Sequence, residues 1–254
     1  GAAAHAGINA AGLAAHGATG PASVLEGRFG FFAAFADRHG VDLQSAIADL
    51  GRRWETPRIA YKPYPACHYI HAPLDAALQA LGGRRPAAEE IAEIVVEVPE
   101  PAVSLVLEPA AEKARPRTPY DAKFSLPYSL AALLIHGRVD LDTYSARAVG
   151  DPAVLSLARA VRYRVKTFAT FPQALPGGAV IRLRDGRTFE AEVSHQRGGP
   201  ENPMSREEVC EKFRANARSA LDGAAAERFE RGVLELDAAR DVRELFATLG
   251  RVNP

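Results

Sequence analysis

The side chains that could do chemistry are densest in residues 61–71, which read Tyr-Lys-Pro-Tyr-Pro-Ala-Cys-His-Tyr-Ile-His and are called the Lys62 loop below. They include one lysine, one cysteine, two histidines and three tyrosines. Pro63 and Pro65 fix φ and exclude a helix at the start of the loop, and a helix-compatible run begins near Ala72. Titratable groups on a stiff loop that leads into a helix are what a small-molecule site needs, so we predict such a site here.

Two side chains of the Lys62 loop have more than one interpretation. Lys62 is either a solvated lysine or a fixed ammonium that binds a substrate carboxylate, or that acts as an acid or base if desolvation lowers its pKa. The neighbouring prolines and tyrosines favour the fixed ammonium, because they stiffen the backbone around it. His71 is either a capping or core histidine or a proton carrier and carboxylate binder near Lys62.

A second group of candidate residues lies in 121–128, Asp-Ala-Lys-Phe-Ser-Leu-Pro-Tyr. Pro127 kinks the apolar helix that follows or marks its start, so Lys123 and Tyr128 lie near a helix N-terminus, which favours anions. We expect Lys123 to contribute to substrate binding. Tyr128 is either a core tyrosine whose hydroxyl finds a partner or a residue of the site.

Cys67, His68 and His71 raise the question of a metal. Zinc takes three or four ligands, whereas Cys67-x3-His71 supplies two and no second cluster completes the set, so we predict no metal site. Cys67 as a nucleophile has no oxyanion-hole signature beside it. The only other cysteine, Cys210, is far away in sequence, which argues against a disulfide framework and favours a reducing cytosol.

Composition excludes several classes of protein. The 254 residues have a formal net charge of zero, so nothing suggests nucleic acid or an anionic membrane as a partner. No apolar run approaches the roughly 20 residues of a membrane span, and we expect a cytoplasmic protein. Residues 1–8 contain no initiator Met and no basic region typical of a signal peptide. They are typical of the middle of an Ala-rich helix, so we expect the chain to be a fragment of something longer.

Hydrophobic periodicity and turn signals predict the elements that position these residues. Helices are expected at 2–16, 23–27, 29–38, from Asp42 or Ser45 to 51, 72–82, 123–136, from 151, 205–221, 224–234 and 238–249, with a short helical turn at 86–90. Strands are expected at 91–98 and 161–167 and as a hairpin over 179–193, with 54–59 extended and 100–120 a partly disordered loop.

The order of these elements predicts an α+β fold. Residues 60–196 form a mixed α+β segment between two helical ones, 1–59 and 197–254. We therefore expect a partial all-helical domain that is interrupted by a smaller α+β lid domain.

Three segments together resemble the MmgE/PrpD family: residues 25–32, 62–71 and 123–128, with further similarity over 197–213. The similarity covers almost the whole chain in order and with similar spacing. It implies the helical domain and lid expected above, usually in a homodimer. It also implies catalysis without a metal or organic cofactor.

The resemblance also implies roles for individual residues. The family's substrate-site lysine matches Lys62, a family histidine matches His71, and the site tyrosine matches Tyr128. Other family site residues have no counterpart here. A family Lys-x-x-His-x-Gly motif would end at Gly1. We therefore expect the chain to be the C-terminal part of such a protein, to hold half a site and to be inactive alone. The missing N-terminal helical portion or a second copy would be its partner.

The activity that the resemblance implies is that of a cofactor-independent lyase. It would act like 2-methylcitrate dehydratase on a small polycarboxylic acid by proton abstraction next to a carboxylate. Alternatives are an epimerase, racemase or decarboxylase of the same family, or a non-catalytic subunit.

Overall fold

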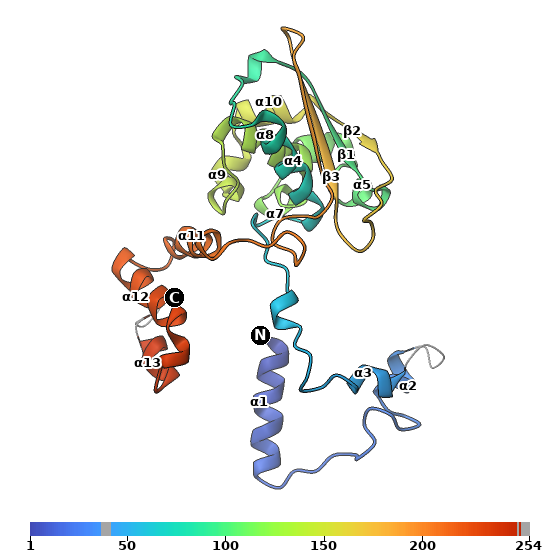
Figure 1. Ribbon diagram of the computed structural model, residues 1–254, viewed down its shortest axis with the longest axis vertical. Coiled ribbons are helices and arrows are strands. Elements are labelled where there is room, and N and C mark those ends of the chain that lie inside the picture. The colour runs from blue at the N-terminus through green and yellow to red at the C-terminus, as the bar shows by residue number, and fades with distance from the viewer. Residues whose placement is uncertain (37–41, 248, 250–254) are drawn as a thin grey trace. The chain divides into compact units, whose positions relative to one another are not determined.

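The computed structural model describes residues 1–36, 42–247 and 249, and the chain divides into two compact units, 1–56 and 57–254. In the first unit, α1 (Ala2–Ala15) is Ala-rich and exposed along its length. The short helices α2 (Phe31–Phe35) and α3 (Leu43–Ile47) follow (Figure 1). Asp42 caps α3, because its carboxylate accepts hydrogen bonds from the N–H groups of Gln44 and Ser45.

Three sequence predictions in this part of the chain need correction. Residues 23–27 form turns and not a helix. The helix expected over 29–38 spans only α2, and Arg38 lies outside the described residues. The stretch 54–59, expected to be extended, contains the 3-10 turn η1 (Thr56–Arg58). Pro57 does not prevent this turn, because the fixed φ of proline suits a first helical turn.

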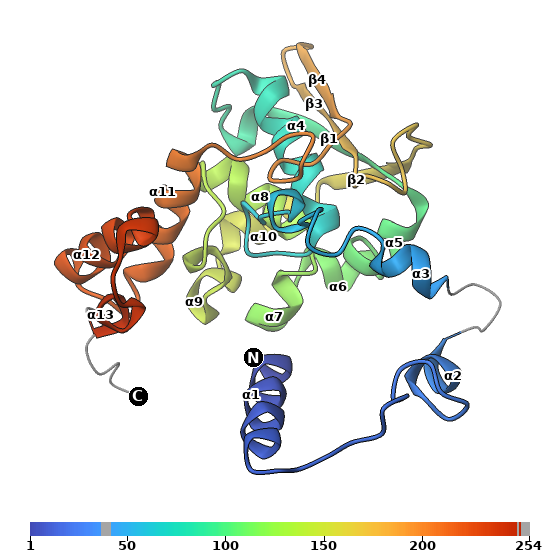
Figure 2. The ribbon, with the colours of Figure 1, turned by 60° about the horizontal axis from the view of Figure 1, so that its bottom comes forward.

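One four-stranded sheet organises the second unit (Figure 2). Its strands are β1 (Ile91–Val98), β2 (Val161–Val165), β3 (Gly177–Leu183) and β4 (Thr188–Val193), in the order β2-β1-β3-β4. β1 and β2 are parallel, and the other pairs are antiparallel. The hairpin predicted from Asp185-Gly186 is confirmed, with Gly186 at the positive φ of 91° that its turn requires.

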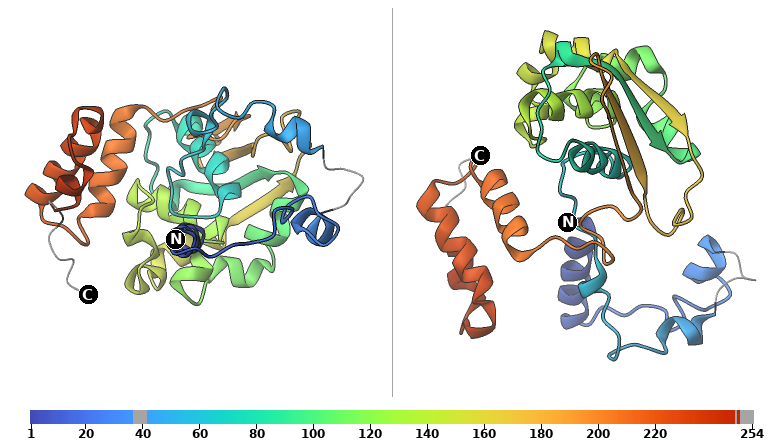
Figure 3. Two further views of the ribbon diagram at one scale, coloured as in Figure 1. Left: turned by 90° about the horizontal axis from the view of Figure 1, so that it is seen from below. Right: turned by 45° about the horizontal axis from the view of Figure 1, so that its top comes forward.

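Helices cover one face of the sheet. α4 (His71–Leu81) packs on β3 and β4, α8 (Leu126–His136) contacts α4, and α10 (Pro152–Ala158) contacts α8. Figures 1 and 3 show these three helices on the same side of the strands. The side chains between them, such as Ile94 and Ile181, are fully buried. Each stabilises the fold by about 1.5–3 kcal/mol relative to an exposed position.

The first turn of α4 is pressed against the start of β3. A Cβ atom added to Gly177 would lie 2.5 Å from the Cδ of Pro73, so only glycine fits at this crossing. The helix ends at Gly82 in the left-handed conformation. Because α4 is fixed at this crossing, the Lys62 loop that precedes it has a defined end point.

The prediction of a partly disordered loop over 100–120 is wrong. The structure has three short helices there, α5 (Glu100–Val106), α6 (Ala110–Ala114) and α7 (Pro119–Ala122). Pro101, Pro109 and Pro119 lie at the N-cap or in the first turn of these helices, where the missing N–H costs nothing. Pro116 lies between α6 and α7. The Lys113 ammonium, which donates to the carbonyl of Phe124 at 2.9 Å, ties α6 to the start of α8.

The remaining helices complete the second unit. α9 (Ala146–Val149) precedes α10, and α11 (Arg206–Ala217), α12 (Gly223–Leu234) and α13 (Val242–Ala247) follow the sheet. A capping box starts α11 at Ser205: its hydroxyl accepts from the N–H of Glu208, and its own N–H donates to the Glu208 carboxylate at 2.7 Å. None of the helices in the described residues is long and apolar enough to span a bilayer.

The backbone that enters the α+β segment lies beside the backbone that leaves it. The N–H of Tyr61 donates to the carbonyl of Gly198 at 2.9 Å. Gly198 has a φ of 94°, and a Cβ there would lie only 1.9 Å from the Tyr61 oxygen. The α+β class is confirmed, whereas the predicted boundaries after residues 59 and 196 stay predictions.

Candidate functional site

The Lys62 loop folds back on itself ahead of α4. The N–H of Cys67 donates to the carbonyl of Lys123 at 2.8 Å, which fixes the middle of the loop to the segment before α8. The Lys62 ammonium donates to the carbonyl of Ala66 at 3.1 Å, and the Nε2 atom of His71 lies 3.4 Å from the same oxygen. The structure therefore brings together Lys62 and His71, the two loop residues predicted to act in the site.

A second histidine, which the sequence did not single out as a catalytic residue, lies beside His71. The short 3-10 helix η2 (His68–Ile70) places the ring of His68 4.7 Å from the ring of His71. His71 is fully buried, and its Nδ1 atom and the Nε2 atom of His68 are buried without a hydrogen-bond partner among the residues that the structure describes. Because buried polar atoms are normally hydrogen-bonded, these two nitrogens keep unused hydrogen-bonding capacity beside Lys62.

Both histidines are neutral near pH 7. Burial lowers the pKa of His71 to about 3, and the nearby His68 and the ammonium groups of Lys62 and Lys212 act in the same direction. Burial, and then the charge of Lys62, also lowers the pKa of His68. A neutral imidazole has one nitrogen that accepts and one that donates, so the pair can receive or relay a proton.

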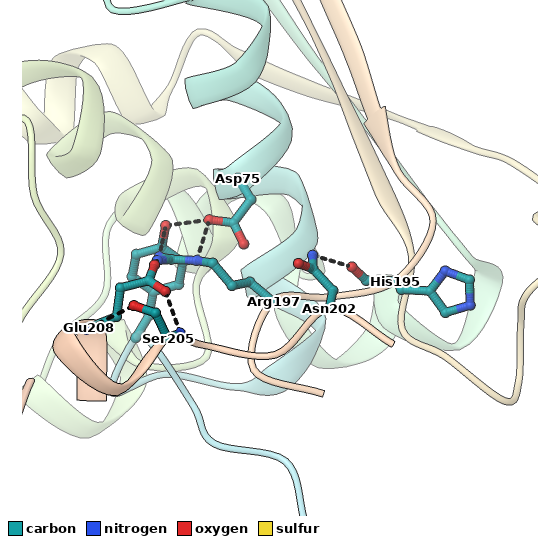
Figure 4. Close-up of polar contacts among 7 residues, drawn as sticks. Asp75, His195, Arg197, Asn202, Ser205 and Glu208 are labelled. Atoms are coloured by element: carbon teal, nitrogen blue, oxygen red, sulfur yellow. Dashed lines mark hydrogen bonds and ion pairs between the residues drawn. The ribbon is translucent and has the colours of Figure 1, made fainter. Parts of the chain in front are cut away.

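A buried polar network holds the Lys62 loop against α4 (Figure 4). The Tyr64 hydroxyl donates to the Asp75 carboxylate at 2.6 Å. The Arg197 guanidinium lies 3.6 Å from the same carboxylate oxygen, donates to the Tyr64 hydroxyl at 3.3 Å and donates to Glu208 at 2.7 Å. Burial raises the pKa of Asp75, although Tyr64 and Arg197 both work against this. The ring of Tyr64 packs edge-on against His71, with 5.4 Å between the centroids, so the network supports the histidine directly.

Sequence reasoning missed this network because its members are scattered. Tyr64 and Arg197 are 133 positions apart, and no periodicity links them. His195 stands just before Arg197 in the sequence, but its ring points away from Arg197 in Figure 4, and its main-chain carbonyl accepts a hydrogen bond from the Asn202 side chain.

The two site residues predicted from 121–128 have different surroundings. Lys123 meets the Lys62 loop through its carbonyl, and its half-buried ammonium makes no hydrogen bond or ion pair with a residue that the structure describes. Tyr128 is 1% exposed and donates its hydroxyl to the carbonyl of Thr143 at 2.7 Å. Burial, and then Asp151, raises the pKa of Tyr128 to about 12. Its hydrogen-bonding capacity is thus used inside the protein.

The cysteines and other potential metal ligands add little to the site. Cys67 is half-buried, Cys210 is buried, and both are free thiols. Across residues 1–36 and 42–247, no three or more His, Cys, Asp or Glu side chains are grouped as metal ligands. The chemical capacity of the loop therefore lies in one ammonium group beside two neutral imidazoles, an arrangement that binds carboxylates and moves protons.

The chain is similar in sequence to several known proteins. The chain is 30% identical over 93% of its length to the cis-aconitate decarboxylase-like protein oryM of Aspergillus oryzae, and 28% identical over 98% of its length to the human cis-aconitate decarboxylase. It is also 29% identical over 94% of its length to the cis-aconitate decarboxylase of Aspergillus terreus. The chain spans 51% of each of these proteins, about half their length. The model of the MmgE/PrpD C-terminal domain matches residues 64–238, and the chain belongs to the MmgE/PrpD family.

Proposed function

We propose that this chain contributes to a lyase that removes carbon dioxide from a small polycarboxylic acid of the cis-aconitate type. The observation that carries the proposal is the Lys62 ammonium beside His68 and His71, each of which has an unused buried nitrogen. The names of the similar proteins supply the substrate class, since all three are named for cis-aconitate decarboxylation.

The proposed reaction needs a cation and a proton relay. Breaking the bond to the departing carboxylate releases carbon dioxide and leaves the electron pair on the carbon skeleton, next to a second carboxylate. A proton must then be added to carbon. Lys62 would bind the retained carboxylate and stabilise the charge that develops there. The Nδ1 atom of His71 and the Nε2 atom of His68 would relay the proton as part of neutral imidazoles, because no protein group occupies them in the described residues.

The other two predicted residues enter this proposal differently. Lys123 would assist by placing a second positive charge close to the Lys62 loop. Its main-chain carbonyl accepts a hydrogen bond from the N–H of Cys67 in that loop. Tyr128 would act on the substrate only if its hydroxyl left Thr143. We therefore assign Tyr128 a structural role, in which its hydroxyl holds the fold together near the site.

Dehydration of a 2-methylcitrate-like acid is the second candidate, because it forms the same kind of carbanion next to a carboxylate. There the proton leaves carbon first and water departs from the neighbouring carbon. Analysis of the products separates the two reactions. Decarboxylation releases carbon dioxide from cis-aconitate, whereas dehydration produces a conjugated alkene from 2-methylcitrate, which is followed in the ultraviolet.

The test uses the full gene product and its Lys62→Met variant with cis-aconitate. We expect carbon dioxide release by the unsubstituted protein and a loss of at least ~10²-fold in kcat/KM for the variant, the usual scale for a positioned acid–base group. Lys166→Met is the matched control. The Lys166 ammonium pairs with Glu97 and Glu192 on the sheet, so its removal should cost stability without affecting turnover. Turnover within threefold of normal in Lys62→Met would contradict the assignment.

A further inference from the structure

The start of α11 is tied to the Lys62 loop through one side chain. Glu208, in the first turn of α11, accepts a hydrogen bond from Arg197, and Arg197 lies over the ring of Tyr64 with 5.5 Å between the guanidinium carbon and the ring centroid. Tyr64 in turn packs against His71. The face of α11 that carries Glu208 is therefore held toward Arg197 and Tyr64.

Lys212 lies one helical turn after Glu208 on this face, because residues four apart stack on the same side of a helix. Its side chain is half-buried. Glu208 does not neutralise it: one carboxylate oxygen of Glu208 binds Arg197, and the other binds the N–H of Ser205. Lys212 has no hydrogen bond or ion pair with any residue in the described part of the chain.

Lys212 and Lys62 both affect His71, although Lys62 precedes the sheet in the sequence and Lys212 follows it. The charges of both lysines are felt at His71, where both lower its pKa. Burial lowers the pKa of Lys212 itself. A partly desolvated ammonium without a counter-ion is unfavourable unless an anion joins it.

We infer that Lys212 is a further cationic contact for the substrate, and that it binds a carboxylate other than the one held by Lys62. The inference rests on the proposed function. Two ammonium groups that come from separate segments and both act on His71 suit an acid with two or three carboxylates better than an acid with one. Lys212 would therefore select for polycarboxylates, and it would contribute to binding more than to the chemical step.

The test is calorimetric binding of tricarballylate, a saturated tricarboxylate that cannot be decarboxylated through an alkene, to the full gene product and to Lys212→Met and Lys212→Arg. We expect binding about 10- to 100-fold weaker in Lys212→Met, the loss of one charge-assisted hydrogen bond, and partial rescue in Lys212→Arg. The control is Arg218→Met, which removes an exposed positive charge at the end of the same helix and should leave affinity unchanged.

Two further measurements exclude a merely structural role. Lys212→Met should unfold at the same or a higher urea concentration than the unsubstituted protein, because it breaks no ion pair. With cis-aconitate its KM should rise about tenfold while kcat changes less than threefold. Equal tricarballylate affinity in Lys212→Met and the unsubstituted protein would overturn the role of Lys212 and leave the proposed function standing. Absence of tricarballylate binding and of cis-aconitate turnover in the unsubstituted protein would overturn both.

Discussion

Arg197 covers the ring of Tyr64 and donates to its hydroxyl at 3.3 Å, which joins the segment after the sheet to the loop before α4. Because Tyr64 also contacts His71, the guanidinium is connected to the candidate site through Tyr64. Two buried groups, the Tyr64 hydroxyl and the Asp75 carboxylate, lie beside the guanidinium. Burial raises the pKa of both, and Asp75 adds to the effect on Tyr64.

Replacing Arg197 by Met should therefore lower the free energy of unfolding by about 2–4 kcal/mol, because Asp75 would keep its burial and lose its counter-charge. Urea unfolding measures the change. In the Asp75→Asn background the same substitution should cost at least about 1 kcal/mol less, since the uncompensated charge is then gone. Equal costs in both backgrounds would contradict the pairing.

Tyr128→Phe distinguishes the two interpretations that the sequence left open for this residue. The bond to Thr143 predicts a loss of about 1–2 kcal/mol in the free energy of unfolding, with kcat for cis-aconitate unchanged within threefold. Chemical unfolding and steady-state kinetics of the same preparation measure both quantities. A loss of ~10²-fold or more in kcat at unchanged stability would instead return Tyr128 to the site.

The strands were predictable because their patterns are local. The β-branched side chains of residues 91–98 predict β1 with both of its bounds, and Asp185-Gly186 predicts the turn of the hairpin. The helices over 100–120 were missed because proline serves both as a helix breaker and as a first-turn residue, and only burial of groups such as Val106 decides between these uses.

The candidate site was predictable only in its contiguous part. Lys62 and His71 share a loop, so their meeting at the Ala66 carbonyl follows from local chain geometry. Asp75 and Arg197 meet only after the chain has passed through the whole sheet, and no spacing in the sequence encodes that contact. The residues that carry the family resemblance therefore identified the Lys62 loop in the sequence. The contact between Asp75 and Arg197 that supports this loop became visible only in the fold.

The buried His71 predicts a pH dependence of stability. Its pKa is about 3 in the folded chain and near its ordinary value of 6.5 when unfolded, so the unfolded state binds more protons as the pH falls below 6.5. The free energy of unfolding should therefore fall with decreasing pH by up to about 1.4 kcal/mol per pH unit from this group. Urea unfolding of His71→Gln between pH 6.5 and 5 should show a slope that is shallower by about that amount. An unchanged slope would mean that His71 protonates freely in the folded protein.

Gly198 is the position at which the two backbone segments touch, and its replacement tests that contact. Gly198→Ala adds a Cβ that would lie 1.9 Å from the carbonyl oxygen of Tyr61, at a residue whose φ is 94°. We expect a loss of roughly 2–5 kcal/mol from overpacking and backbone strain together. Gly186→Ala is the matched control, because Gly186 has a φ of 91° and open space around it, so only the strain of about 1–2 kcal/mol applies. Equal losses for the two variants, measured by urea unfolding, would show that Tyr61 and Gly198 separate at no cost. A larger loss at Gly198 together with a raised KM for cis-aconitate would tie this backbone contact to the position of Lys62, one residue after Tyr61.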